Sequence, residues 1–259
     1  MRLNADSSHL LGPAATHQLA HQEAARQHDL AATAHSHAYN AHDSAANHHV
    51  SLAQDNPEAP IHNLAAGKHK VQANAHRGHF DRHVNSAEYH RCASFEEPSD
   101  ESIATARHSS QAAQRSSTQA EASFRQMQAA HSHNDAADAH HDAADAHRIV
   151  HERTGRNPRT AQLQTLHSQA AHKHRTMAHD HIQSSFKHSP AYSTHADDAH
   201  SVHKASQSAA QAHESAQDAR KSAREARNAP RSVLAACNAP AAPPRKGSFR
   251  KRLIRYFFA

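Results

Sequence analysis

Histidine and alanine recur along this chain at helical spacing, with polar residues between them. Histidines follow one another in unbroken seven-residue steps in four series. The series are His21, His28, His35, His42 and His49; His62, His69, His76, His83 and His90; His133, His140 and His147; and His167, His174, His181, His188 and His195. The residues three and four positions after these histidines are mostly small. Because seven residues make two helical turns, each series follows one helix face and takes the place that leucine or isoleucine usually fills.

Prolines, glycines and capping residues divide this pattern into helices. Ser99 is an expected N-cap, followed by Asp100 and Glu101 in the first turn of a helix. Pro190 interrupts the last helix, either as a kink or as a new helix start. The expected helices are 14–53, 60–92, 99–153 and 160–226.

The fold class that follows is all-α: an elongated antiparallel bundle of long helices with histidine and alanine seams, built from two αα-hairpins. The early part of the third helix departs from the repeat, because Gln119, Ser123 and Gln126 stand on its seam. The expected segments are a polar N-terminal lead at 1–13, the bundle at 14–228 with hairpins at 14–92 and 99–228, a Pro-rich linker at 229–244 and a basic aromatic tail at 245–259.

Composition limits how such a bundle is stabilised and what it does. The 37% of hydrophobic residues are mostly alanine, and each alanine buries little area. The chain has only five glycines, and it lacks phosphate-binding loops, HExxH and GxSxG. We therefore expect a protein that is not an enzyme and that requires no cofactor.

Three interpretations of the histidine series follow from their chemistry. Neutral imidazole has one donor and one acceptor, so paired rings can pack and hydrogen-bond between helices. Protonation near pH 6.5 would instead charge the seams and open the bundle. The third interpretation is a site for zinc, nickel or copper. Rings of one series lie about 10.5 Å apart along the helix, so metal ligands must come from neighbouring helices or from residues outside the series.

Two local clusters are candidate metal sites. Each brings histidine or aspartate side chains to one helix face at helical spacing. The candidate ligands are His76, His79 and His83 in the first cluster, and Asp138, His141, Asp142 and Asp145 in the second.

The last fifteen residues differ from the rest of the chain. They hold six of the 29 Lys and Arg residues and no acidic residue, and aromatic residues lie among these charges at helical spacing. We expect them to be a docking peptide for an acidic protein, an anionic membrane surface or nucleic acid. The docking residues are Arg245, Lys246, Phe249, Arg250, Lys251, Arg252, Leu253, Arg255, Tyr256 and Phe257.

Segments such as residues 28–35, 41–48 and 135–141 resemble the AHxxAAxAH heptad repeats of uncharacterised phage and bacterial open reading frames. The resemblance covers most of residues 14–215 and implies a structural or accessory protein. Our expectation is a structural protein that docks through its tail, with transition-metal binding by inter-helix histidine layers as the alternative. We expect self-association, because long helices often cover a remaining apolar face in this way. No secretory signal or membrane-length apolar run is present, so the expected location is the cytoplasm, or the virion if the chain is phage-encoded.

Overall fold

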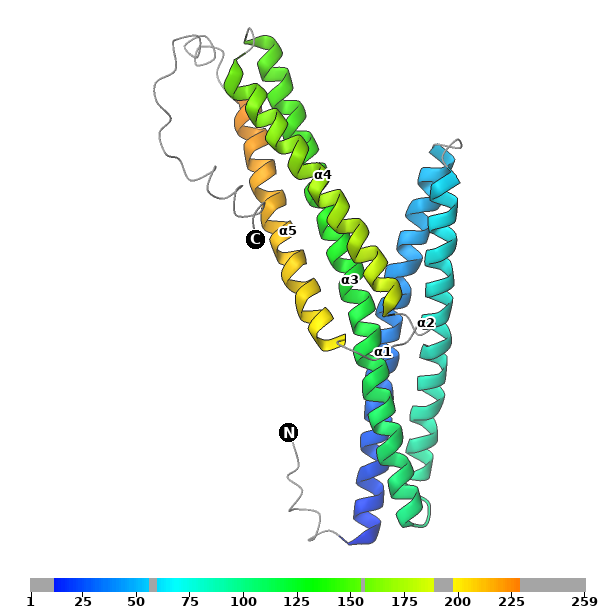
Figure 1. Ribbon diagram of the computed structural model, residues 1–259. Coiled ribbons are helices and arrows are strands. Elements are labelled where there is room, and N and C mark those ends of the chain that lie inside the picture. Colours follow the sequence, from blue (N-terminus) through cyan, green and yellow to red (C-terminus); the bar gives the residue numbers. More distant parts are fainter. Residues whose placement is uncertain (1–11, 56–59, 155–156, 189–197, 229–259) are drawn as a thin grey trace. The chain divides into compact units, whose positions relative to one another are not determined.

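The computed structural model describes residues 12–55, 60–154, 157–188 and 198–228. These residues form five helices and no strand, so the expected all-α fold is confirmed (Figure 1). The helices are α1 (Pro13–Asp55), α2 (Pro60–Ala93), α3 (Asp100–Arg153), α4 (Pro158–Lys187) and α5 (Asp198–Asn228). Pro190, the linker and the basic tail lie outside the described residues.

The helix starts follow from local chemistry. Proline is the first residue of α1, α2 and α4, where its missing N–H costs no hydrogen bond. At α3, the Ser99 hydroxyl accepts a hydrogen bond of 3.1 Å from the Ser102 N–H, which confirms the expected N-cap. Asn157 caps α4 in the same way, because its Oδ1 accepts a hydrogen bond of 2.9 Å from the Arg159 N–H.

The chain forms two compact units, and α3 contributes to both. Unit 1 comprises α1, α2 and α3 up to Met127, together with residues 183–203. Unit 2 comprises α3 from Gln128 onward, α4 up to Ile182 and α5 from Lys204 onward.

In each unit two helices form an antiparallel pair, and a third runs parallel to the first of them. In unit 1, His21 of α1 lies opposite His90 of α2, while His49 lies opposite His62, so the order is reversed. The α3 serines follow the order of α1. Unit 2 repeats this arrangement with α3 and α4 as the antiparallel pair and α5 parallel to α3.

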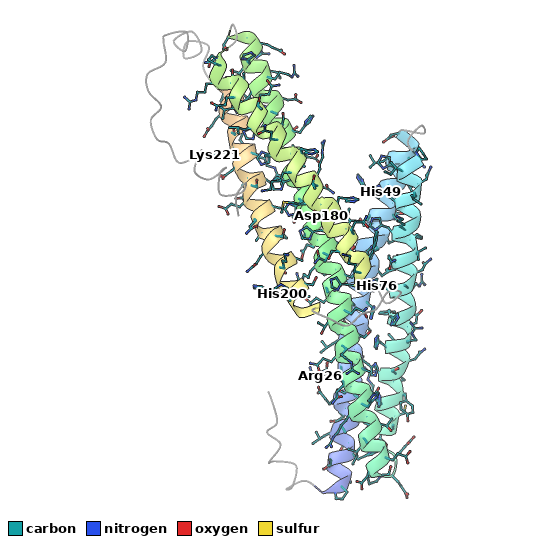
Figure 2. The ribbon with its side chains drawn as sticks, in the orientation of Figure 1. Arg26, His49, His76, Asp180, His200 and Lys221 are labelled. Carbon is teal, nitrogen blue, oxygen red and sulfur yellow. The ribbon has the colours of Figure 1, made fainter. Side chains whose placement is uncertain are left out.

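Each unit has a core of alanine and histidine. Apart from Met127 and Val150, the buried hydrophobic side chains of the described residues are all alanines. Most seam histidines are at least 90% buried, whereas charged side chains such as Arg26 and Lys221 are exposed (Figure 2). None of the described helices contains an apolar stretch long enough to cross a membrane.

Candidate functional site

Histidines of the antiparallel helices meet in pairs, one pair for every two helical turns. In each pair the Nδ1 atoms of the two rings lie within hydrogen-bonding distance. In unit 1 the pairs are His21–His90 (3.0 Å), His28–His83 (2.8 Å), His35–His76 (2.9 Å), His42–His69 (3.1 Å) and His49–His62 (3.3 Å). In unit 2 they are His133–His174 (2.8 Å) and His140–His167 (2.8 Å).

Serines of the third helix bond to the other ring nitrogen, Nε2. Each of five serines lies 2.8–3.0 Å from two Nε2 atoms, one on each helix of the pair. They are Ser109 (His28 and His90), Ser116 (His35 and His83), Ser208 (His133 and His181), Ser215 (His140 and His174) and Ser222 (His147 and His167). The two rings that share a serine are nearly parallel, as in His147 and His167, whose centroids are 5.6 Å apart with an interplanar angle of 9°.

Most of these contacts join into a continuous hydrogen-bonded network in each unit, whereas the His42–His69 and His49–His62 pairs of unit 1 lie outside it. The unit 1 network runs through Ser102, His21, His90, Ser109, His28, His83, Ser116, His35 and His76. The unit 2 network runs through His181, Ser208, His133, His174, Ser215, His140, His167, Ser222 and His147. A neutral ring has one N–H, and each Nδ1–Nδ1 contact needs one donor. When each shared serine accepts from one ring and donates to the other, all hydrogen bonds of a network therefore point in one direction.

Each network ends at a buried nitrogen without a hydrogen-bond partner among the described residues, namely Nε2 of His76 and Nδ1 of His147. The next serine of the ladder after Ser116 is Ser123, whose hydroxyl donates to the Ser185 carbonyl oxygen at 3.2 Å. In unit 2, His140 pairs with His167, so the position opposite His147 is seven residues before His167 and holds Thr160. The Thr160 hydroxyl donates to a backbone carbonyl oxygen. The networks thus stop where a hydroxyl group is engaged elsewhere.

Burial keeps these rings neutral. Loss of hydration, followed by the charge of the neighbouring rings His76 and His79, lowers the pKa of His35 to about 2. In unit 2 the same causes lower the pKa of His140 to about 3, and burial together with the charge of His147 lowers that of His167 to about 4. Neutral rings are the form that can hydrogen-bond in both directions and can bind a metal ion.

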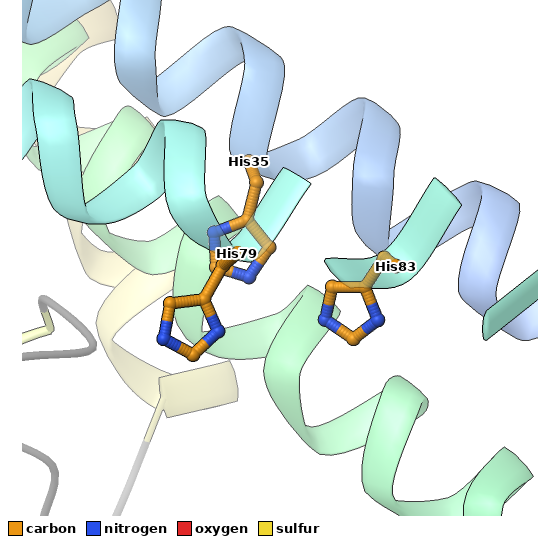
Figure 3. Close-up of side chains that lie close together, drawn as sticks. All are labelled: His35, His79 and His83. Atoms are coloured by element: carbon orange, nitrogen blue, oxygen red, sulfur yellow. The ribbon is translucent and has the colours of Figure 1, made fainter. Parts of the chain in front are cut away.

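One layer of unit 1 holds a third ring. His35 of α1 and His79 and His83 of α2 each offer a ring nitrogen, and these three nitrogens all lie within 4.8 Å of one another (Figure 3). His35 and His83 are buried and His79 is half-buried. His79 and His83 are four residues apart on one face of α2, and α1 places His35 against them.

The structure places the sequence-predicted metal ligands in different surroundings. His79 and His83 lie together with His35, whereas His76 is hydrogen-bonded to His35 through Nδ1 and is not part of the group of three. In the second cluster, His141 Nε2 lies 3.8 Å from Asp145 Oδ2, and both side chains are about half exposed. Asp145 also pairs with Arg148 at 3.3 Å, and Asp138 and Asp142 are exposed. These four residues do not belong to a metal-ligand group of three within the described part of the chain.

The serine ladders were missed in the sequence analysis, although they carry a clear signal. Serines recur every seven residues on the third helix of each unit, and each is followed four residues later by a small or apolar residue. They are Ser102, Ser109, Ser116 and Ser123 on α3, and Ser201, Ser208, Ser215 and Ser222 on α5. The seam at Gln119 and Gln126 is not an irregularity either, because both side chains are buried and Gln126 donates a hydrogen bond of 2.7 Å to Ser201.

The docking residues of the tail lie outside the described residues. Comparison with protein-family models, with curated proteins and with solved structures finds no match to this chain.

Proposed function

We propose that this chain is a non-enzymatic structural protein, in which layers of neutral histidine and serine hold helices together and a basic aromatic tail docks it to a partner. One observation carries the structural part: in the layers around His28, His83, His133 and His140, both ring nitrogens are engaged across helices. Groups that hydrogen-bond to one another in this way serve packing and specificity, since a buried polar group without a partner is costly.

The test of the structural part is metal independence. Tag-free protein in excess chelator should keep its helical circular dichroism signal and its hydrodynamic size, because its layers are closed by hydroxyl and imidazole groups. A chain that requires metal to fold would lose its helicity under these conditions. Loss of helicity in chelator, restored by added zinc, would contradict the structural proposal.

The tail supports the docking part through its sequence. Its six positive charges and its aromatic residues suit a partner with an anionic surface. Removing residues 245–259 should abolish binding to anionic vesicles, duplex DNA or an acidic protein, whichever the full chain binds, and should leave the helicity unchanged. Equal binding by the full chain and the truncated chain would contradict this role.

Self-association is part of the same proposal. Ile61, Leu64 and Val71 are spaced three and seven residues apart on α2, and each side chain is 60–69% exposed. A second copy of the chain covering this face would remove that apolar surface from water. Sedimentation analysis of the protein and of a variant with Leu64→Glu and Val71→Glu tests this: the variant should shift toward monomer, and a monomeric unchanged protein would contradict it.

A second candidate function is transition-metal binding by the histidine layers. The observation that favours it is the group formed by His35, His79 and His83, because three imidazole nitrogens on two helices lie within 4.8 Å of one another. Neutral imidazole suits zinc, nickel and copper. Retention of stoichiometric metal by tag-free protein after gel filtration in a weak chelator tests this function.

A further inference from the structure

His79 stands outside the regular histidine ladder. It follows His76 by three residues, and the equivalent positions of α2 hold Ala65, Gln72, Ser86 and Ala93. On α4, which occupies the same place in unit 2, the residues three positions after the histidines include Ala170, Met177 and Ser184. The described layers of unit 2 therefore have two rings where this layer of unit 1 has three.

His79 packs against His35 without joining the hydrogen-bonded network. Its ring lies almost parallel to that of His35, with centroids 5.0 Å apart and an interplanar angle of 19°, and it makes no hydrogen bond to another described residue. His35 and His83, in contrast, use both ring nitrogens in the unit 1 network. His79 thus brings free nitrogen donors to a place where two other imidazoles already meet.

Ser116 connects the other two rings. Its Oγ lies 2.9 Å from Nε2 of His35 and 2.9 Å from Nε2 of His83. A single rotation of this hydroxyl group therefore frees both nitrogens at once, and they face the same small volume. A zinc ion bonds imidazole nitrogens at about 2.0 Å, which places them roughly 3.3 Å apart in a tetrahedron. The three nitrogens lie within 4.8 Å of one another, so they must approach by up to about 1.5 Å to bind one ion. His79 makes no hydrogen bond to a described residue that would oppose this movement.

We propose that His35, His79 and His83 form a binding site for one divalent transition-metal ion of the zinc, nickel and copper class, which takes the place of the Ser116 hydroxyl between the rings. This site rests on the second candidate function above and gives it specific ligands. Three nitrogen ligands exclude magnesium and calcium as preferred occupants, because those ions require oxygen ligands. With three protein ligands, one tetrahedral position stays open to water.

The site is tested by zinc binding in competition with a chromophoric chelator, which removes weakly held ions from the other histidines of the chain. The unchanged protein should retain one tightly bound zinc ion. His79→Ala should weaken this binding by at least ~10-fold, since loss of a mere supporting hydrogen bond to a ligand already costs that much in metal sites. His172→Ala is the matched control, because His172 is exposed on α4 and its loss should leave zinc binding unchanged.

Two serine variants distinguish zinc binding at this site from the general affinity of zinc for histidine side chains. Ser116→Ala removes the hydroxyl that competes with the ion and should tighten zinc binding. Ser109→Ala removes the equivalent hydroxyl from a layer with only two rings and should not tighten it. Equal zinc affinity in Ser116→Ala and in the unchanged protein would contradict the proposal that the ion takes the place of the Ser116 hydroxyl.

The outcomes also distinguish this site from the second candidate function. If the unchanged protein retains no zinc against the chelator, both the metal-binding function and this site are wrong. If His79→Ala retains zinc as tightly as the unchanged protein, the chain binds metal elsewhere and this site is wrong. Circular dichroism of each variant verifies the fold, and His79→Gln, which keeps a side chain of similar size, serves for the same comparison if His79→Ala is less helical.

Discussion

At the scale of single residues, the serine hydroxyl supplies the hydrogen bond that the paired imidazole rings still lack. A neutral imidazole needs one donor and one acceptor, and its partner on the opposite helix supplies only one of them. Ser215, which is 4% exposed, supplies the other for both His140 and His174 at 2.9 and 3.0 Å. A small hydroxyl on the third helix therefore joins that helix to the other two, a role that bulky apolar side chains fill in an ordinary helical core.

Ser215→Ala should lower the free energy of unfolding by about 2–6 kcal/mol, because it leaves two buried ring nitrogens without a partner at about 1–3 kcal/mol each. Urea unfolding followed by circular dichroism measures this loss. Ser168→Ala on α4 is the control, since Ser168 is exposed and its replacement should change stability by no more than about 0.5 kcal/mol. Equal stability of the two variants would show that the hydroxyl group adds nothing to the layer.

At the scale of helices, α3 changes its role along its length. Its first half supplies serines to unit 1, and its second half supplies histidines to unit 2. On α3 the histidine series of unit 2 begins with Gln119 and Gln126, which lie fourteen and seven residues before His133, while Ser123 ends the serine ladder of unit 1. The serine ladder and the histidine series overlap on α3 for about one helical turn, from Gln119 to Ser123. One continuous helix therefore contributes to the layers of both units.

The direction of the hydrogen bonds predicts the tautomer on each helix. In the unit 2 network, one direction places the proton on Nδ1 of His133 and His140 of α3, and on Nε2 of His167 and His174 of α4; the opposite direction exchanges the two tautomers. Nitrogen-15 chemical shifts of the imidazoles at pH 7.5 should therefore show one tautomer on α3 and the other on α4. Different tautomers for His133 and His140 would mean that the network has no single direction.

At the scale of the whole molecule, the histidines make stability depend on pH. In unit 2 burial lowers the pKa of His133 and His140 to about 3 and that of His167 and His174 to about 4, while the unfolded value is near 6.5. A lowered folded pKa means that the unfolded chain binds protons first. The stabilisation is therefore complete above pH 6.5 and is lost as the pH falls from 6.5 toward these folded values.

Each of these four rings should cost about 1.4 kcal/mol of stability per pH unit well below pH 6.5. Urea unfolding at pH 7.5, 6.5, 5.5 and 5.0 should show a steep loss, with acid unfolding before pH 5. The groups that face His140 are His167 and His174 of α4 and Ser215 of α5, so no acidic side chain of the described residues offsets its protonation. His140→Gln, which introduces the residue already present at Gln126, should make the dependence less steep. A constant free energy of unfolding between pH 7.5 and 5.0 would contradict the prediction.

Much of the fold was determined by the sequence alone. The seven-residue period and the strong helix propensity of alanine are local properties, so they predict the helices and the buried face of each one without knowledge of any neighbour. Caps and prolines are local as well, which is why Ser99 and the ends of α1 to α3 were predicted closely. His79 and His83 were recognised as neighbours because they share one helix face.

Only the tertiary structure decided which seams meet. The partner of a ring depends on the relative register of two helices, and a period of seven fits every register that differs by two turns equally well. His35 lies beside His79 and His83 because of the register between α1 and α2. Serine hydroxyls lie between the rings because the third helix brings them there. The seven-residue repeat of these serines is visible in the sequence, but their partners are not, since the rings that a serine contacts depend on how the helices assemble.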